Sequence, residues 1–212
     1  MSQTPTSAVQ LAIVLSIASL LPAIVLTCTC FARFGIVFAF LKGGLGAQGA
    51  PPNQVLVGLA LFMTLFVMAP VAQKVNDDAL QPYLSGKLDE SAALAAATPP
   101  LRGFLLAHTR QDDLALFTNA AGMARPQTPA DVPLKIAIPA FVVSELQTAF
   151  QMGLLVLLPF LVIDLIVATV LSSMGMVMLP PAAIALPVKI LVFVAVDGWH
   201  LIVASLLKGM YT

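Results

Sequence analysis

Three ionisable side chains of complementary charge lie deep inside apolar segments of the sequence: Glu145, Asp164 and Lys189. A charge inside an apolar segment costs about 2.5–3.5 kcal/mol on membrane-insertion scales, so such a group faces a partner or a water-filled path. Three interpretations stay open, namely a salt bridge within the chain, a charge network between neighbouring subunits, and a proton relay. We favour the network between subunits, and we expect Arg33 and Asp197 to be further buried charges.

A methionine-rich segment, residues 173–181, joins two apolar runs near the end of the chain. Methionine is flexible and polarizable, so Met174, Met176 and Met178 can close around varied shapes. A ring of such segments can seal a pore and still yield to a passing chain. From composition alone, however, the interpretation we favour is an ordinary hydrophobic turn between two helices.

Other chemistry-bearing residues give no sign of an enzyme. His108 and His200 lack cysteines or paired acids at metal-ligand spacing, and no nucleophile elbow or His-Glu-x-x-His zinc helix occurs. Trp199, beside His200, is typical of an interfacial anchor. We therefore expect no catalytic residue, no metal and no cofactor. A formal net charge of zero also gives nucleic-acid binding no electrostatic support.

The elements that must position these residues are apolar helices. Hydrophobic residues make up 59% and charged residues 9% of the 212 residues, whereas soluble domains carry roughly 25% charged residues. The apolar runs are Leu11–Leu41 with a kink expected at Pro22, Val55–Ala72, Pro133–Ser172 broken by Pro139 and Pro159, and Ala182–Leu207. A Gly- and Pro-rich turn, Lys42–Asn53, separates the first two runs.

Most charged residues lie in a polar stretch, Gln73–Val132, which has fragments of helical spacing. The sequence thus predicts an all-α, membrane-associated fold in which two hydrophobic hairpins with kinked or broken helices, residues 1–72 and 133–212, flank a small polar helical domain, residues 73–132. Lys42 in the first short loop favours a cytoplasmic loop and hence a periplasmic polar domain. Met1–Gln10 has no basic region before the apolar run, which argues against a cleavable signal peptide.

Several short motifs, in order along the whole chain, resemble the FliP/SctR family of type III export proteins. They are residues 51–62 (PPNQVLVGLALF), 80–83 (LQPY), 109–117 (TRQDDLALF), 144–150 (SELQTAF), 163–165 (IDL), 186–189 (LPVK) and 196–199 (VDGW). The stretches around residues 79–83 and 113–117 favour the flagellar branch over the virulence branch.

The resemblance implies a non-enzymatic core subunit of a type III export gate in the bacterial inner membrane, at the flagellar or injectisome basal body. It implies a homo-oligomer, expected to be pentameric, with FliQ-like and FliR-like membrane subunits. Further expected partners are FlhA/FlhB-like export-gate proteins and unfolded protein substrates. The family's hairpins are held largely by each other above the membrane plane, which explains prolines and charges that need burial in protein.

Carried over residue by residue, Glu145, Asp164 and Lys189 match the family's buried charges between neighbouring subunits. Met174, Met176 and Met178 fall in its methionine gasket, where Val177 interrupts the usual methionine run. Valine is stiffer at χ1 than methionine, so we expect a less pliable gasket. Outside the family, the competing hypotheses are a small proton-coupled transporter and an intramembrane hydrolase using Asp164 or Asp197.

Overall fold

The computed structural model describes residues 19, 22–47, 49–124, 126–176 and 178–211, and all regular structure in these residues is helical. The all-α prediction is therefore confirmed for this part of the chain, while the expectation about a signal peptide concerns residues outside it. The main elements are α2 (Phe31–Leu45), α3 (Asn53–Val75), η1 (Asn76–Leu80), α4 (Gln81–Leu84), α5 (Glu90–Ala107), α6 (Gln111–Ala120), η2 (Pro129–Asp131), α7 (Leu134–Ser173), α8 (Pro181–Ala195) and α9 (Gly198–Tyr211).

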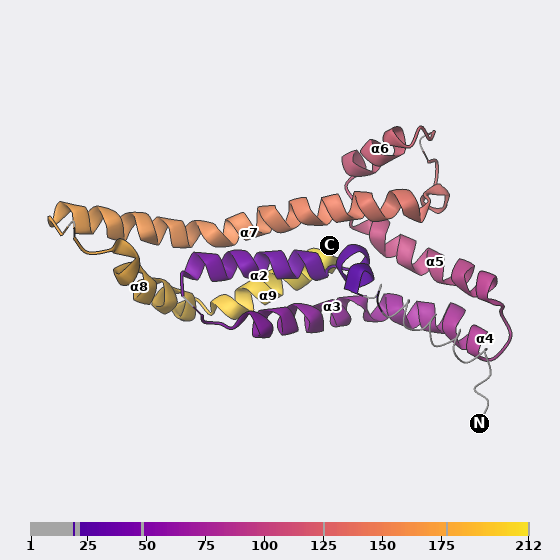
Figure 1. Cartoon of the computed structure of the whole chain (residues 1–212), viewed down its shortest axis with the longest axis horizontal. Coiled ribbons are helices and arrows are strands. Elements are labelled where there is room, and N and C mark those ends of the chain that lie inside the picture. The colour runs from indigo at the N-terminus through magenta and orange to yellow at the C-terminus, as the bar shows by residue number, and fades with distance from the viewer. Residues whose placement is uncertain (1–18, 20–21, 48, 125, 177, 212) are drawn as a thin grey trace, which may run out of the picture.

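Helix α2 runs alongside α7, which is the longest helix of the described chain (Figure 1). The 40 residues of α7 give a length of about 60 Å. Helix α2 makes its most extensive contacts with α7 and also packs on α3, while α6 and α5 pack near the opposite end of α7 from α8. The chain is thus an elongated body with α5 and α6 at one end and α8 at the other.

The core runs along one face of α2, because its buried residues recur at helical spacing. Phe34, Phe38 and Leu41 are each at most 1% exposed. Two glycines let α2 and α7 approach closely. A Cβ at Gly44 would lie 2.6 Å from Phe160, and one at Gly153 would collide with the ring of Phe40.

The prediction that prolines break the third apolar run is wrong. Pro139 and Pro159 both lie inside the single helix α7. Each proline removes one backbone N–H donor and crowds the preceding turn, which costs about 3 kcal/mol in an isolated helix. Packing against α2, α6 and α8 holds the helix together where local propensity would not.

The sharp bends lie at other places. The helical segment Pro22–Cys28 meets α2 at 83°, so one sharp bend follows Cys28. The kink expected at Pro22 stays a prediction, because residues 20 and 21 lie outside the described part of the chain. Helices α8 and α9 meet at 63°. The turn between the first two apolar runs is also shorter than the predicted Lys42–Asn53, because α2 continues through Lys42 to Leu45. The helix ends where Gly46 adopts a left-handed conformation with φ of 68°.

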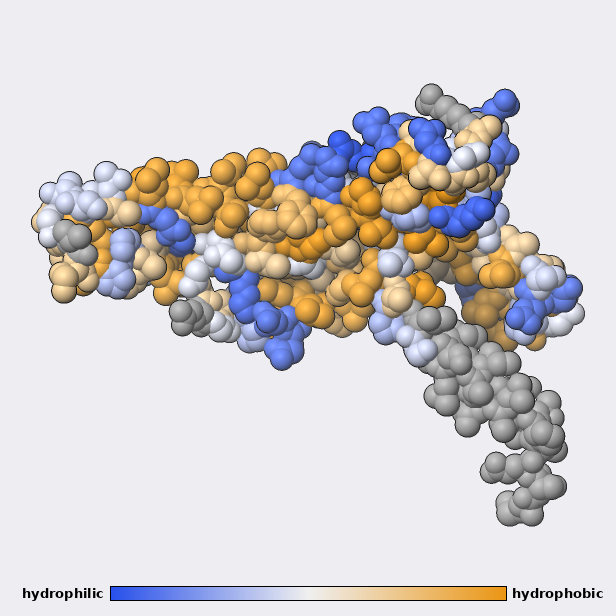
Figure 2. Space-filling view, turned by 45° about the horizontal axis from the view of Figure 1, so that its top comes forward, coloured by the Kyte–Doolittle hydropathy of each residue, from blue (hydrophilic) through white to orange (hydrophobic). Residues whose placement is uncertain are grey.

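Two described helical stretches are long and apolar enough to cross a membrane, Asn53–Leu84 and Leu134–Ser173, or up to four if each bent pair forms one span. Asn53–Leu84 runs through residue 72, where the sequence placed a domain boundary, and α5 packs back on α3 and α7. The exact hairpin and domain division stays a prediction. Figure 2 shows apolar residues over much of the elongated body and hydrophilic residues gathered at the end that carries α6.

Two aspartates organise local turns in the polar part. Asp89 caps α5 by accepting a hydrogen bond from Ala92 N at 2.7 Å, and this bond lowers the pKa of the Asp89 carboxyl. Asp131 accepts bonds from the hydroxyl and the backbone N–H of Thr128, at 2.8 and 2.9 Å, which likewise lower its pKa. Both carboxylates satisfy donors that would otherwise be left unpaired at a helix start.

We expect Gly153→Ala to lower the free energy of unfolding by about 1–3 kcal/mol, because an added Cβ would meet the Phe40 ring and also its Cβ at 3.1 Å. Rotating the ring alone would not relieve the second contact. Thermal unfolding of the detergent-solubilised chain measures the effect. Gly35→Ala on α2 is the matched control, since an added Cβ there meets nothing within 4 Å. Equal melting temperatures for the two variants would contradict the close-packing account.

Candidate functional site

The best-built polar cluster in the described chain is centred on Glu145, which lies on the face of α7 that packs against α2. Arg33 of α2 donates from Nε to Glu145 Oε2 at 2.8 Å and from Nη2 to Oε1. Both residues are buried, with Arg33 4% and Glu145 1% exposed. The two parallel bonds form the fork geometry in which arginine recognises a carboxylate most specifically.

The remaining terminal nitrogen of Arg33 reaches a third helix. Arg33 Nη1 donates to the backbone oxygen of Gly209 at 3.1 Å. Gly209 lies in the last turn of α9, where carbonyl oxygens have no donor within their own helix. A cation is also favoured there by the helix dipole. Arg33 therefore joins α2, α7 and α9 through a single side chain.

The residue beside Glu145 fixes the start of α6. Ser144 is fully buried, and its hydroxyl donates to Asp113 Oδ2 at 2.6 Å. The same hydroxyl accepts a bond from Arg110 N at 2.9 Å. Because Ser144 and Glu145 are neighbours on α7, the anchor of α6 and the Arg33 pair lie side by side. Together they form one polar layer across α2, α6, α7 and α9.

A second charged cluster lies much farther along α7. Lys189 of α8 donates to Asp164 Oδ2 at 2.7 Å and to the backbone oxygen of Gly44 at 2.9 Å. Lys189 is 6% exposed, but the side chain of Asp164 is 42% exposed. A cavity of about 370 Å³ opens beside this pair, lined in part by Gly43 and Leu186. This second pair is thus half open to the outside of the chain.

The three charges predicted as one network form two separate groups within the chain. Nineteen residues of helix separate Glu145 from Asp164, which corresponds to roughly 30 Å. Glu145 is paired with Arg33, and Asp164 with Lys189. These contacts are of the kind that the intrachain interpretation expected. A contact of either pair with a neighbouring subunit stays a prediction.

Arg33 is buried as expected, but the chain's own fold does not bury Asp197. This residue lies at the bend between α8 and α9 with φ of 52°, and its side chain is exposed. The backbone N–H of Asp197 donates to Val194 O at 3.1 Å, and its carbonyl accepts from Leu201 N. Trp199 next to it packs edge-on against Phe193 with ring centroids 5.4 Å apart. The role of Asp197 here is therefore to turn the chain.

The methionine-rich segment connects α7 to α8 and projects its side chains outward. Met174 is 66% exposed, Met176 is 39% exposed and Met178 is 98% exposed. Such exposure of large apolar side chains at one end of the molecule suits contact with other chains. Closure of a pore by these residues stays a prediction.

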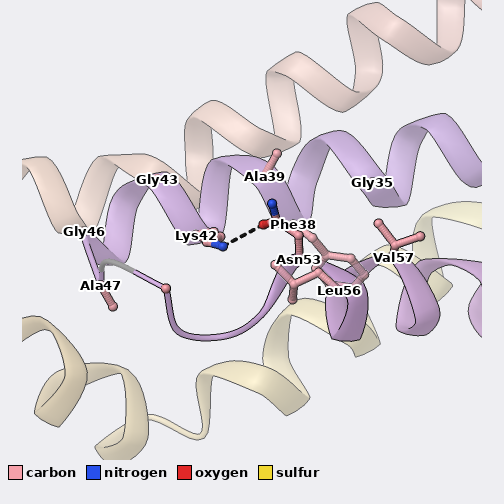
Figure 3. Close-up of a pocket in the computed structure, with 11 residues that line it drawn as sticks. Gly35, Phe38, Ala39, Lys42, Gly43, Gly46, Ala47, Asn53, Leu56 and Val57 are labelled. Atoms are coloured by element: carbon pink, nitrogen blue, oxygen red, sulfur yellow. Dashed lines mark hydrogen bonds between the residues drawn. The ribbon is translucent and has the colours of Figure 1, made fainter.

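The turn between α2 and α3 encloses the third feature of interest, a pocket of about 610 Å³ (Figure 3). Lys42 Nζ donates across its mouth to Asn53 Oδ1 at 2.6 Å. Among the described residues that line this pocket, Lys42 alone is charged. Nor do the described residues contain a group of three or more His, Cys, Asp or Glu side chains that could hold a metal ion. The clearest feature of this pocket is therefore the Lys42–Asn53 hydrogen bond, which joins α2 to the start of α3.

Sequence reasoning missed several members of the polar layer. Arg33 was expected to be buried but was not predicted to pair with Glu145. Arg33 is the only charged residue before Lys42 in the sequence, and its charge is opposite to that of Glu145. Ser144 and Asp113 were noticed only as parts of motifs. No spacing rule links residues 31 positions apart, so only the fold could join them.

A family model described as the FliP family matches residues 14–206. The chain is 51% identical over 204 residues to the flagellar biosynthetic protein FliP of Bacillus subtilis (strain 168), covering 96% of this chain and 92% of that protein. It is 47% identical over 210 residues to the protein of the same name from Pectobacterium carotovorum subsp. carotovorum, covering 99% and 81%. For Caulobacter vibrioides (strain ATCC 19089 / CIP 103742 / CB 15) the identity is 46% over 201 residues, covering 95% and 76%. The family match includes both ion pairs and the methionine-rich segment.

We expect Glu145→Gln to lower the free energy of unfolding by about 3–5 kcal/mol, because it leaves the buried Arg33 charge uncompensated. Combining it with Arg33→Met removes that orphaned charge, so the double variant should be more stable than Glu145→Gln alone. Thermal unfolding of the unmodified chain, the two single variants Glu145→Gln and Arg33→Met, and the double variant in detergent gives the coupling energy between the two side chains. Glu90→Gln, at an exposed acid on α5, is the control. Additive losses in the double variant would show that the two side chains do not act as a pair.

Proposed function

Because the chain belongs to the FliP family, we propose that it is a core subunit of a flagellar type III export gate. In this proposal several copies, expected to be five, assemble with FliQ-like and FliR-like membrane subunits beside FlhA/FlhB-like export-gate proteins. The complex conducts unfolded flagellar proteins in extended form and blocks small ions at rest. It lies in the bacterial inner membrane at the flagellar basal body, with the polar part of this chain on the periplasmic side. The chain itself has a structural role and no enzymatic one.

The observation that carries this proposal is the large apolar surface that the chain leaves open. In the most apolar 18-residue windows of α7 and of the Asn53–Leu84 stretch, only 11% and 28% of residues are buried within the chain. Helix α7 is also about twice as long as the roughly 30 Å hydrocarbon core of a bilayer. Lipid alone cannot cover its full length, so neighbouring protein chains are the natural partners of these faces.

The flagellar assignment, rather than the injectisome one, is supported by the names of the relatives. Each of the three relatives described above is a flagellar biosynthetic protein, and the identity reaches 51% over nearly the whole chain. The two ion pairs suit different tasks in such an assembly. The sealed Arg33–Glu145 pair can hold one subunit in shape, whereas the half-exposed Asp164 can also meet a neighbour.

The first test is to co-express the chain with its genomic neighbours and to measure the native mass of the complex that co-purifies. A discrete complex with several copies of this chain and two small membrane partners supports the proposal. Partners from a virulence cluster instead of a flagellar one would move the assignment to the injectisome. A lone monomer or dimer that takes up ions or solutes in liposomes would overturn the proposal in favour of a transporter.

We expect Glu145→Ala and Lys189→Ala to weaken assembly of the complex and to abolish export. The first removes the partner of buried Arg33, and the second removes the cation that joins α8 to α7 and α2. Native mass and secretion of flagellar proteins into the medium are the two measurements. Glu90→Ala should leave both unchanged, because Glu90 is exposed. Normal mass and normal export in both variants would exclude a role of the charges in assembly.

We also expect the combined change of Met174, Met176 and Met178 to alanine to let ions leak through the resting complex, because short side chains cannot fill the pore. Conductance of the purified complex in planar bilayers measures the leak. Met123→Ala, in the polar part of the chain, is the control variant. A resting conductance equal to that of the unmodified complex would count against a methionine gasket.

A further inference from the structure

His108, at the C-terminal end of α5, lies between two carbonyl oxygens. Its Nδ1 is 2.9 Å from the backbone oxygen of Phe104, one turn earlier in α5. Its Nε2 is 3.2 Å from the backbone oxygen of Met210, in the last turn of α9. The ring is half-buried and also packs on the Phe104 ring, with centroids 4.6 Å apart. One imidazole therefore connects the polar part of the chain to its last helix.

The chemistry of these contacts constrains the protonation state of the ring. A carbonyl oxygen only accepts hydrogen bonds, so each ring nitrogen of His108 must donate for both bonds to exist. A neutral imidazole carries one N–H, whereas the imidazolium carries two. The observed pair of contacts is thus complete only when the ring is positively charged.

The end of α9 is suited to hold a cation. The last carbonyl oxygens of a helix have no donor within the helix, and they lie at the negative end of its dipole. Arg33 already occupies Gly209 O, and His108 occupies the next carbonyl, that of Met210. Side chains from α2 and from the end of α5 thus contact adjacent carbonyls of α9.

The helices around this contact also carry ionisable residues. Glu145 of α7 lies within electrostatic range of His108, although Arg33 of α2 shares that carboxylate. From α6 come the carboxylate of Asp113 and, at the helix start, Arg110. Helix α9 carries Lys208 and Tyr211 on either side of Gly209 and Met210 in the sequence.

We propose that His108 is a protonation-dependent latch, which in its imidazolium form holds the C-terminal turn of α9 against α5. Loss of the ring proton leaves a single N–H. The bond to Phe104 O lies within one turn of the same helix and needs no docking of α9, so the neutral ring keeps it. The bond to Met210 O is lost, and the end of α9 is released. This latch does not depend on the proposed export function.

A rise in pH weakens the latch. The latch exists only while the ring carries its second proton, so its contribution is present at low pH and is lost as the pH rises. Unperturbed histidine titrates within the range from about pH 5 to 8. The C-terminal turn of α9 should therefore be docked at the acidic end of that range and loosened at the alkaline end.

Hydrogen–deuterium exchange of the full chain in nanodiscs tests the latch. After correction for intrinsic exchange, we expect the α9 peptide that ends at Tyr211 to exchange roughly tenfold faster at pH 8.5 than at pH 5, as for loss of one charged hydrogen bond. His108→Phe keeps the aromatic contact but has no donor, so its exchange should be fast at both pH values. His200→Gln, at the exposed second histidine on α9, should behave like the unmodified chain. Exchange of the unmodified chain that does not change with pH, or a change that His108→Phe retains, would overturn the proposal.

A second measurement covers the case in which His108→Phe does not fold. The chain has two histidines, so ¹⁵N labelling of the imidazole rings gives two sets of signals, which His200→Gln assigns. Both His108 nitrogens should be protonated at pH 5, and the loss of one proton should coincide with the rise in α9 exchange. An unprotonated His108 nitrogen at pH 5 while α9 stays protected would refute the latch.

Discussion

The buried pair of Arg33 and Glu145 is the contact on which the arrangement of helices depends. Apolar faces alone give little preference for one register of helices over another, because lipid or a partner can cover them equally well. A buried carboxylate that must meet one guanidinium has no such freedom. Through its bond to Gly209 O the same guanidinium also holds α9 against α2. The pair therefore selects one arrangement of three helices out of many with similar apolar contacts.

The two ion pairs differ in how far the chain closes them, and this difference bears on assembly. Glu145 is sealed within one chain, so neighbouring subunits can add little to it. Asp164 keeps 42% of its side chain exposed, and the cavity beside it is lined by glycine and apolar residues. In the proposed gate, the first pair belongs to folding of the subunit. The second is placed where a neighbouring chain can complete the burial of the carboxylate.

Sequence reasoning succeeded where hydropathy or a charge in an apolar run was sufficient. It predicted an all-α chain, the burial of Arg33, Glu145 and Lys189, and the methionine-rich connection, because each follows from local composition. It failed at Pro139 and Pro159, since packing overrides the local cost of proline. At Asp197 a left-handed backbone turns the chain and the side chain is exposed within the single chain, so its burial stays a prediction for the assembled complex. The pairing of Glu145 with Arg33 needed contacts between residues 112 positions apart, which no periodicity can supply.

Because α7 is one continuous helix, a tilt at one of its ends moves the other end. Ser144 anchors it to α6 in its first half, and the methionine-rich segment hangs from its far end. From Ser144 to Ser173 the helix extends about 44 Å, so a tilt of about 5° about the anchored end displaces the methionines by roughly 4 Å. A displacement of that size is comparable to the width of a side chain. In the proposed gate, a small tilt of α7 at the polar end would therefore displace the methionine-rich segment at the opposite end.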